Sequence, residues 1–238
     1  MPSKVKLKQY QQLGSKKFRQ KYGLFVVEGL KSVNELANSD WPMECILCTH
    51  AFLERYGEQI EFEFDLVSTD EFAATSTLAN PQEVLAIAQI HQTDKPISEW
   101  QIALDGINDP GNLGTIIRIA DWYGINTIYC SANTVDLYNS KVIQSTMGSF
   151  LRVNVVSGDL PELLKDKHVY ATLLDGENIR TIPSPKAGVL LIGNEANGIN
   201  DETLKNITYT PVTIPGRGTT ESLNAAMATA ICCERLMG

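Results

Sequence analysis

Residues 189–226 read VLLIGNEANGINDETLKNITYTPVTIPGRGTTESLNAA and twice pass from an apolar run to a loop of glycine and polar residues. Residues 189–192 are continuously apolar, which is typical of a strand buried on both faces of a parallel sheet. A second strand-like run, residues 211–214, ends at Pro215. Because ligands bind beyond the carboxyl ends of parallel strands, these two neighbouring strand ends predict one pocket.

Both loops contain glycines that allow sharp turns. Residues 193–198 have the pattern G-x-E-x-x-G, and residues 216–220 read GRGTT before Ser222, Leu223 and Asn224 open an alanine-rich helix. Glycine at such positions lets the main chain turn and present its amides and carbonyls to a ligand. Turns of this kind are also ordinary in α/β proteins, so neither loop identifies a ligand by itself. The G-x-G-x-x-G signature of dinucleotide sites and the G-K-[S/T] signature of phosphate-binding loops are missing from the sequence.

Length and composition indicate a globular protein. The 238 residues leave room for two domains of roughly 100–150 residues each. Hydrophobic residues make up 43% and charged residues 20%, and no apolar run approaches the ~18–20 residues that cross a membrane. The first residues, MPSKVKLKQYQQLG, lack the apolar segment of a signal peptide. We therefore expect a cytoplasmic protein with no membrane partner.

The cysteines and histidines predict no metal site. Five cysteines, an odd number, argue against a disulfide framework. Cys45 and Cys48 form a C-x-x-C pattern inside an apolar run, but no second pair follows at zinc spacing, so we interpret them as structural thiols. His50, His91 and His168 are scattered along the chain, without a pattern of neighbouring carboxylates.

Charge is distributed unevenly along the chain. The net charge is −8, yet residues 1–31 carry +7 and the remainder −15. A basic segment on an acidic body can bind nucleic acid by neutralising phosphates. The alternative for the basic segment is a solvated amino-terminal helix without a nucleic-acid partner. For the GRGTT segment, which contains Arg217, the alternative is an exposed flexible loop. The candidate phosphate contacts are Lys16, Lys17, Arg19 and Lys21, with Arg217 as a further one.

The hydrophobic pattern predicts two α/β domains. A helix over residues 3–22, a strand over 24–27 and a last strand over 84–90 describe a first domain of residues 1–93. The polar stretch HQTDKPISEW, residues 91–100, marks the boundary, and the second domain covers residues 97–238. There a strand over 101–105 is followed by a glycine-rich loop up to Gly114, and a helix over 115–123. Further strands alternate with helices near 140–147 and 160–164, which predicts a parallel sheet.

Three motifs resemble those of a known family in their order and spacing. They are Asn112-x-Gly114-x-x-x-Arg118, Gly193-x-Glu195-x-x-Gly198, and Ile214-Pro215 with Ser222-Leu223-Asn224. They resemble the motifs of SpoU-type (TrmH-like) RNA ribose 2′-O-methyltransferases in the SPOUT superfamily, and the resemblance covers residues 101–238. It implies an α/β SPOUT domain with a parallel sheet, a deep trefoil knot at the carboxyl terminus and a homodimer. The first domain resembles, in topology alone, a ribosomal-protein-like RNA-binding domain.

The resemblance also implies a cofactor, S-adenosylmethionine. Gly193, Ile214 and Leu223 would contact it through their main chain, with Thr172 and Leu173 as a neighbouring wall. Methyl transfer from a sulfonium to a ribose hydroxyl is an in-line displacement that needs no metal. Positioning the reacting atoms can lower the barrier of such a step by roughly 7–11 kcal/mol in favourable cases.

Within the family motif, Arg118 would lie at the target ribose and phosphate, where it has been suggested as the base. A guanidinium group stays protonated near neutral pH, so we hypothesise that Arg118 instead clamps the RNA phosphate and stabilises the charge of the hydroxyl as it loses its proton. Taken without the motif, it would be an ordinary arginine on the surface of a helix.

Four further residues would orient the reacting groups: Asn112, Glu195, Ser222 and Asn224. Glu195 would hold Arg118 or an asparagine, while Ser222 and Asn224 would shape the loop and the substrate side. Each has a structural alternative, since Asn112 and Ser222 precede predicted helices as N-caps do, and Glu195 can brace its own turn.

Ribosomal RNA is the favoured substrate because of the additional domain, with transfer RNA as the alternative. The ribose is favoured over a base as the methylated group. Two other classes stay open: a non-catalytic RNA-binding assembly factor that keeps the knotted fold, and a small-molecule α/β enzyme. The five polar motif residues argue against the first, and the basic amino-terminal segment argues against the second.

Overall fold

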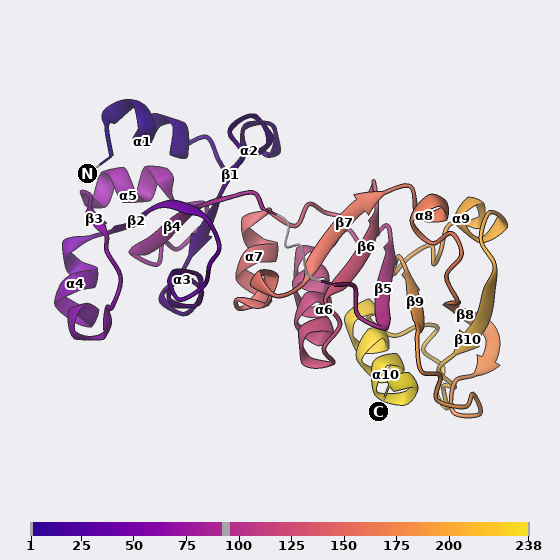
Figure 1. Ribbon diagram of the computed structural model, residues 1–238. Coiled ribbons are helices and arrows are strands. Elements are labelled where there is room, and N and C mark those ends of the chain that lie inside the picture. Colours follow the sequence, from indigo (N-terminus) through magenta and orange to yellow (C-terminus); the bar gives the residue numbers. More distant parts are fainter. Residues whose placement is uncertain (1, 92–95, 238) are drawn as a thin grey trace. The chain divides into compact units, whose positions relative to one another are not determined.

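The computed structural model of the chain describes residues 2–91 and 96–237 (Figure 1). It divides into two units: the first runs to residue 92 and also contains Asp136–Leu151, and the second contains Thr93–Val135 and Arg152–Gly238. The domain boundary predicted at residues 91–100 falls partly on residues 92–95, which lie outside the described residues.

The first unit is built on a four-stranded sheet in the order β1-β4-β2-β3. β4 pairs antiparallel with both β1 and β2, and β3 pairs parallel with β2. β1 and β4 are almost entirely buried, as their unbroken apolar sequences require. The elements are α1 (Lys4–Tyr10), α2 (Lys16–Tyr22), β1 (Leu24–Glu28), α3 (Leu30–Ala37), β2 (Met43–Cys48), α4 (His50–Tyr56), η1 (Gly57–Gln59), β3 (Asp65–Leu66), α5 (Thr69–Thr75), β4 (Val84–Gln89), α7 (Ser140–Thr146) and η2 (Ser149–Leu151).

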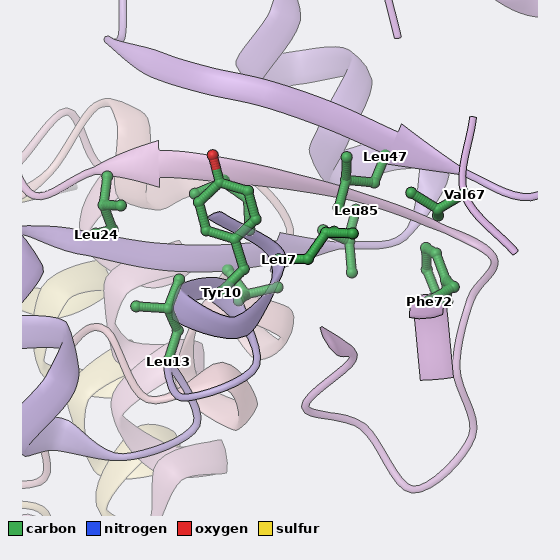
Figure 2. Close-up of a cluster of buried hydrophobic side chains, with 10 residues drawn as sticks. Leu7, Tyr10, Leu13, Leu24, Leu47, Val67, Phe72 and Leu85 are labelled. Carbon is green, nitrogen blue, oxygen red and sulfur yellow. The ribbon is translucent and has the colours of Figure 1, made fainter. Parts of the chain in front are cut away.

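The helix predicted over residues 3–22 is wrong as a single helix. The structure has two short helices, α1 and α2, separated by residues 11–15. Gly14 and Ser15 interrupt the helix where both residues favour turns over helix interiors. The break lets α1 pack on the sheet: Leu7, Tyr10 and Leu13 join strand residues and Phe72 of α5 in one buried cluster (Figure 2).

Asp136–Leu151 packs with the first unit although it follows β6 in the chain. Phe25 of β1 is fully buried, with ring centroids 4.7 Å from Tyr138, 5.9 Å from Phe150 and 6.4 Å from Trp41. The two contiguous domains predicted from sequence place this segment in the second domain, whereas its apolar contacts lie in the first unit. Burial of these aromatic rings provides the physical reason.

The second unit is a six-stranded sheet in the order β10-β8-β9-β5-β6-β7. Every neighbouring pair is parallel, which confirms the predicted parallel sheet. Its elements are β5 (Trp100–Asp105), α6 (Pro110–Trp122), β6 (Thr127–Ser131), β7 (Asn154–Gly158), α8 (Leu160–Leu163), β8 (Val169–Asn178), β9 (Gly188–Gly193), α9 (Asp201–Lys205), β10 (Tyr209–Thr213) and α10 (Ala225–Met237).

Helices cover both faces of this sheet. Ala103, Val189 and Leu191 pack with residues of α8 and α9, whereas α6 and α10 pack against each other, with α6 also on β6 and α10 on β9. Side chains alternate between the two faces of a strand, so a strand covered on both faces is apolar throughout. This explains the continuous run in residues 189–192. After edge strand β10, the chain returns to the middle of the sheet to form α10.

The helix predicted over residues 115–123 begins earlier, at Pro110. Asp109 is its N-cap, and the Asp109 carboxylate accepts a hydrogen bond from the main-chain N–H of Asn112 at 2.8 Å. Proline fits the first turn of a helix because its missing N–H would lack an intrahelical partner there. Asn112 therefore lies on the first helical turn and not in a loop.

All five cysteines are free thiols. Burial raises the pKa of Cys48 to about 11, and the pKa values of Cys130, Cys232 and Cys233 to about 12. Among the residues that the structure describes, no helix is long and apolar enough to cross a membrane, and no cluster of His, Cys, Asp or Glu has the arrangement of a metal site.

The burial of Phe150 predicts that the segment after β6 stabilises the first unit. Phe150 is 1% exposed, so Phe150→Ala should lower the free energy of unfolding of that unit by about 3–5 kcal/mol, through lost contacts and the cavity left behind. Urea unfolding followed by near-ultraviolet circular dichroism measures it. Phe64→Ala is the control, because Phe64 is 38% exposed, and should cost less than about 1 kcal/mol. Equal effects would contradict this assignment.

Candidate functional site

The carboxyl ends of three adjacent parallel strands, β10, β8 and β9, lie at one edge of the second sheet. Pairing between β8 and β9 ends at Ala171 and Leu191. β9 runs on to Gly193, and Ile214 follows the last residue of β10. Gly193 ends β9 and Ile214 follows β10, while Thr172 and Leu173 lie within β8, directly after its pairing with β9 ends. All four were predicted as cofactor contacts.

β8 leaves its partner strand at this edge. Ala171 pairs with Pro211, but the next residue of β10, Val212, pairs with Glu177, so residues 172–176 have no partners in β10. The Thr172 hydroxyl donates to the Leu191 carbonyl at 3.0 Å, and Leu174 is 81% exposed. Pairing with β10 resumes at Glu177, and a Cβ on the preceding Gly176 would lie 2.5 Å from the Val212 carbonyl carbon. Main-chain groups of Thr172 and Leu173 are therefore outside both strand ladders.

Asn194 organises the turn that follows β9. Its side-chain oxygen accepts hydrogen bonds from the amides of Ala196 (2.9 Å) and Asn197 (3.2 Å), and its side-chain amide donates to the Gly106 carbonyl at 2.7 Å. Its main chain exchanges two 2.9 Å hydrogen bonds with Gly198. The turn is thereby closed on itself and tied to the end of β5.

Gly193 is required for the close approach within this turn. A Cβ at this position would lie 2.2 Å from the carbonyl carbon of Gly198 and 2.3 Å from the amide nitrogen of Ile199, closer than atoms can pack. The first glycine of the G-x-E-x-x-G pattern therefore has a steric role, and Glu195 projects from a turn held at both ends.

Asn112 bridges the segments of the three sequence motifs. Its side-chain nitrogen donates a hydrogen bond to Glu195 Oε1, and its side-chain oxygen accepts one from Asn224 Nδ2 at 2.9 Å. An amide suits this position because it both donates and accepts. The structure thus brings together Asn112, Glu195 and Asn224, three of the five residues predicted as catalytic. Glu195 holds an asparagine, which was one of the two partners predicted for it.

Asn224 is also the residue that caps α10. Its side-chain oxygen accepts from the amides of Ala226 (3.0 Å) and Met227 (3.3 Å). The N-cap roles considered for Asn112 and Ser222 belong instead to Asp109 and Asn224. Ser222 and Leu223 are exposed in the connection before α10.

Arg118 lies on the exposed side of α6, six residues after Asn112. Within the described residues, the structure records no hydrogen bond or ion pair for its guanidinium, so the side chain is available to a ligand. Six residues correspond to about 9 Å along a helix axis. The structure therefore does not bring Arg118 into contact with the Asn112 bridge.

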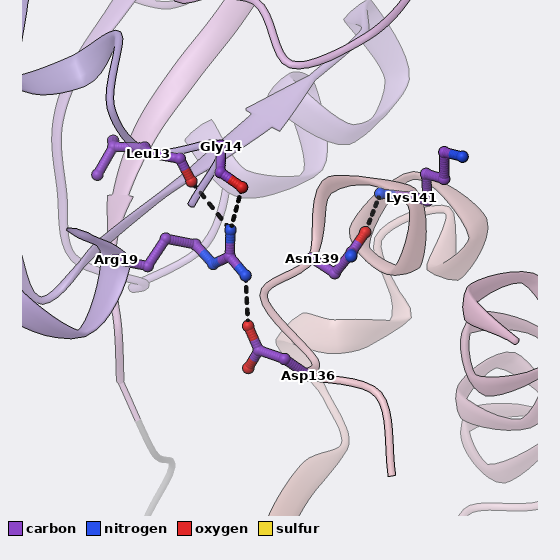
Figure 3. A network of polar contacts seen from close by, with 6 residues as sticks. All are labelled: Leu13, Gly14, Arg19, Asp136, Asn139 and Lys141. Carbon is purple, nitrogen blue, oxygen red and sulfur yellow. Dashed lines mark hydrogen bonds and ion pairs between the residues drawn. The ribbon is translucent and has the colours of Figure 1, made fainter. Parts of the chain in front are cut away.

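Arg19 was predicted as a phosphate contact, and the structure argues against that role. It is 5% exposed, and its guanidinium donates to the carbonyls of Leu13 (3.0 Å) and Gly14 (2.9 Å) and to Asp136 Oδ2 at 2.7 Å (Figure 3). The sequence shows that residue 19 is positively charged, but it does not show that the side chain of Arg19 points into the protein. Lys16, Lys17, Lys21 and Arg217 are exposed, as a contact with phosphate would require, and their role stays a prediction.

Three supporting residues were not among the predicted site residues: Asp109, Asn194 and Gly106. Asp109 followed by proline is a recognisable N-cap, and asparagine beside glycine is typical of a side-chain-capped turn. These signals were present in the sequence. The contact between Asn194 and Gly106 was not, because it joins residues 88 positions apart.

The chain matches two family models. The SpoU rRNA Methylase family model matches residues 99–234, and a model described as MRM3-like substrate binding domain matches residues 4–86. RlmP of Bacillus subtilis, a 23S rRNA (guanosine(2553)-2′-O)-methyltransferase, is 30% identical over 239 residues, covering 98% of this chain and 96% of the relative.

Two solved structures resemble the whole chain. One is of a protein from Porphyromonas gingivalis assigned to the TrmH family of RNA methyltransferases, with 30% identity, a TM-score of 0.86 and coverage of 99% of this chain and 98% of the other. The second is an AdoMet-bound rRNA methyltransferase from Sinorhizobium meliloti, with 28% identity, a TM-score of 0.81 and coverage of 99% and 96%.

The contacts of Asn194 predict that this side chain holds the turn of residues 194–198. Asn194→Ala should speed hydrogen exchange at the amides of Ala196 and Asn197 by about fivefold, because each lost hydrogen bond contributes about 1 kcal/mol. Amide exchange followed by NMR measures it. Asn197→Ala is the matched control, since no described contact involves that side chain, and unchanged protection in Asn194→Ala would contradict the assignment.

Proposed function

The chain belongs to the SpoU rRNA Methylase family, and from that premise we propose that it is an S-adenosylmethionine-dependent RNA methyltransferase that modifies a ribose 2′-hydroxyl of ribosomal RNA. The observation that carries the proposal is the Asn112 bridge, which joins residues of all three motifs and includes the turn that follows β9.

The strand ends suit a nucleoside cofactor bound by main-chain groups. Thr172 and Leu173 lie outside the strand ladders, and Gly193 and Ile214 end or follow the strands on either side of β8. Leu223, which is 49% exposed, would add a main-chain contact from the connection before α10. Bound S-adenosylmethionine supplies a methyl group on a positively charged sulfur. These residues would hold it, and no metal is needed.

Arg118 would bind the phosphate next to the target ribose. Its guanidinium has no partner among the described residues and presents a planar set of donors that suits phosphate. A positive charge there stabilises the hydroxyl oxygen as its proton leaves. Arg118 therefore acts as a clamp and an electrostatic stabiliser, and not as the base.

The Asn112 bridge would orient the groups around that hydroxyl. Glu195 and Asn224 are exposed, so their remaining hydrogen-bonding capacity faces solvent and is open to the RNA. Ser222, two residues before Asn224 and also exposed, would complete the substrate side. Fixing these side chains before the RNA binds avoids the entropic cost of ordering them in the reaction.

The first unit would hold the RNA, with Lys16, Lys17 and Lys21 contacting phosphates and Arg217 contributing from the second unit. Ribosomal RNA is favoured over transfer RNA, because two relatives that match 98% and 93% of the chain are named as 23S rRNA enzymes. A homodimer, the trefoil knot and a cytoplasmic location stay predictions.

Transfer of labelled methyl from S-adenosylmethionine to RNA tests the proposed function. Ribosomal and transfer RNA purified from a strain lacking this gene are the substrates, and resistance to alkaline cleavage identifies a methylated ribose. We expect label at one ribose of ribosomal RNA, and its loss in Arg118→Ala. Cofactor binding without transfer to either RNA would favour a non-catalytic assembly factor.

Arg118→Lys tests whether the arginine binds phosphate through its planar pair of donors. Lysine keeps the charge but lacks the planar pair of donors, so we expect kcat/KM to fall about 10- to 100-fold. Full activity in Arg118→Lys would contradict the clamp. Lys205→Gln, an exposed change on α9, controls for a general loss of positive charge.

A further inference from the structure

Helix α2 (Lys16–Tyr22) has an unusual combination of side chains. Its sequence, KKFRQKY, contains four cations and two aromatic residues but no carboxylate. Lys16, Lys17 and Lys21 are exposed, and the structure records no ion pair for them among the residues it describes. The exposed side of α2 is therefore positively charged although the whole protein carries a net charge of −8.

The fourth cation, Arg19, fixes the helix from its buried side. It ties α2 to the carbonyls of Leu13 and Gly14 and to Asp136 (Figure 3). A buried arginine with an ion pair and two carbonyl contacts holds one geometry, because breaking these contacts would leave a buried charge without partners. The exposed side of α2 is thus presented by a rigid helix.

The two aromatic rings of α2 stack on each other. Phe18 and Tyr22 have centroids 5.9 Å apart and planes 17° apart. Tyr22 packs against the hydrophobic core of the unit and its hydroxyl donates to Gln12 at 3.2 Å, which fixes this ring. Phe18 is half-buried and is not a member of that core cluster. It therefore extends an anchored aromatic stack toward the surface.

A lysine lies close to each ring. Lys17 Nζ is 5.9 Å from the centroid of Phe18, and Lys21 Nζ is 5.2 Å from that of Tyr22. At an exposed site such a contact contributes only about 0.5–1 kcal/mol, so a ligand can displace it at little cost. A nucleobase stacks on the ring, while the released ammonium binds the neighbouring phosphate. Single-stranded RNA is recognised by this combination of aromatic stacking and cations.

We propose that α2 is a nucleobase platform of the RNA site, where an unpaired base of the substrate stacks on Phe18 while Lys16, Lys17 and Lys21 bind the adjoining phosphates. The proposal rests on the proposed function and names the residues through which the first unit would take its RNA. Charge favours a polyanion over a basic partner, since α2 carries four cations and no carboxylate, and the stacked rings of Phe18 and Tyr22 favour RNA among polyanions.

The test uses the full-length protein and ribosomal RNA from a strain lacking this gene. Ultraviolet crosslinking followed by mass spectrometry should give an adduct on Phe18. Phe18→Leu should raise both the Kd and the KM for this RNA about tenfold and leave kcat unchanged, because one stacked base is lost. The double variant Lys17→Gln/Lys21→Gln should reduce the slope of log Kd against log salt by about 1 to 2.

Two matched variants control for general effects. Phe64→Leu changes another partly exposed phenylalanine of the first unit, and Lys167→Gln removes a lysine whose Nζ lies 5.4 Å from the centroid of Tyr129 in the second unit. Both should leave Kd and KM unchanged. Melting temperatures establish that Phe18→Leu is folded. The variant Lys17→Gln/Lys21→Gln changes exposed side chains only, so it tests RNA binding by α2 without altering the protein core.

The outcomes separate this proposal from the proposed function. If the wild type methylates the RNA and the α2 variants match it in Kd, KM and salt dependence, α2 is not the platform and the methyltransferase assignment stands. If the wild type transfers no methyl group to any RNA, the assignment fails, and the Kd values of Phe18→Leu and of the lysine variant still decide whether α2 binds RNA.

Discussion

The side-chain amide of Asn112 joins segments that are far apart in the chain. It donates to Glu195, 83 residues away, and accepts from Asn224, 112 residues away. Each partner is held by its own segment, Glu195 by the turn closed by Asn194 and Asn224 by its role as the cap of α10. The bridge therefore fixes the start of α6, the turn after β9 and the start of α10 relative to each other.

The parallel sheet makes this bridge and the strand ends parts of one site. β9 and β5 lie side by side, so Gly193 pairs with Asp105, and Asn194 reaches the carbonyl of Gly106. On the other side of β9, β8 leaves its ladders at Thr172. The main-chain groups that we propose for the nucleoside and the polar side chains that we propose for the ribose thus lie at one edge of the sheet, where parallel α/β proteins bind ligands.

The sequence was sufficient for the features that depend on local pattern. The apolar run of residues 189–192 predicted a central strand, and the resemblance of the three motifs to a known family implied a group of polar residues, of which Asn112, Glu195 and Asn224 are in contact. Tertiary features were not predictable in this way. The burial of Arg19 depends on Asp136, 117 residues away, and the membership of Phe150 in the first unit depends on its contact with Phe25. The start of α6 was missed because Gly111 and Gly114 suggested a loop, although Asp109 and Pro110 carry helix-start signals.

The energetic coupling of Asn112 to its two partners is the measurement that tests the bridge most directly. Double-mutant cycles of Asn112→Ala with Glu195→Ala, and of Asn112→Ala with Asn224→Ala, would be measured on kcat for methyl transfer to ribosomal RNA. If the three residues act as one unit, each single variant loses most of the activity and the double variants are hardly worse. Losses that simply multiply in the double variants would show that the residues act independently and would contradict the account.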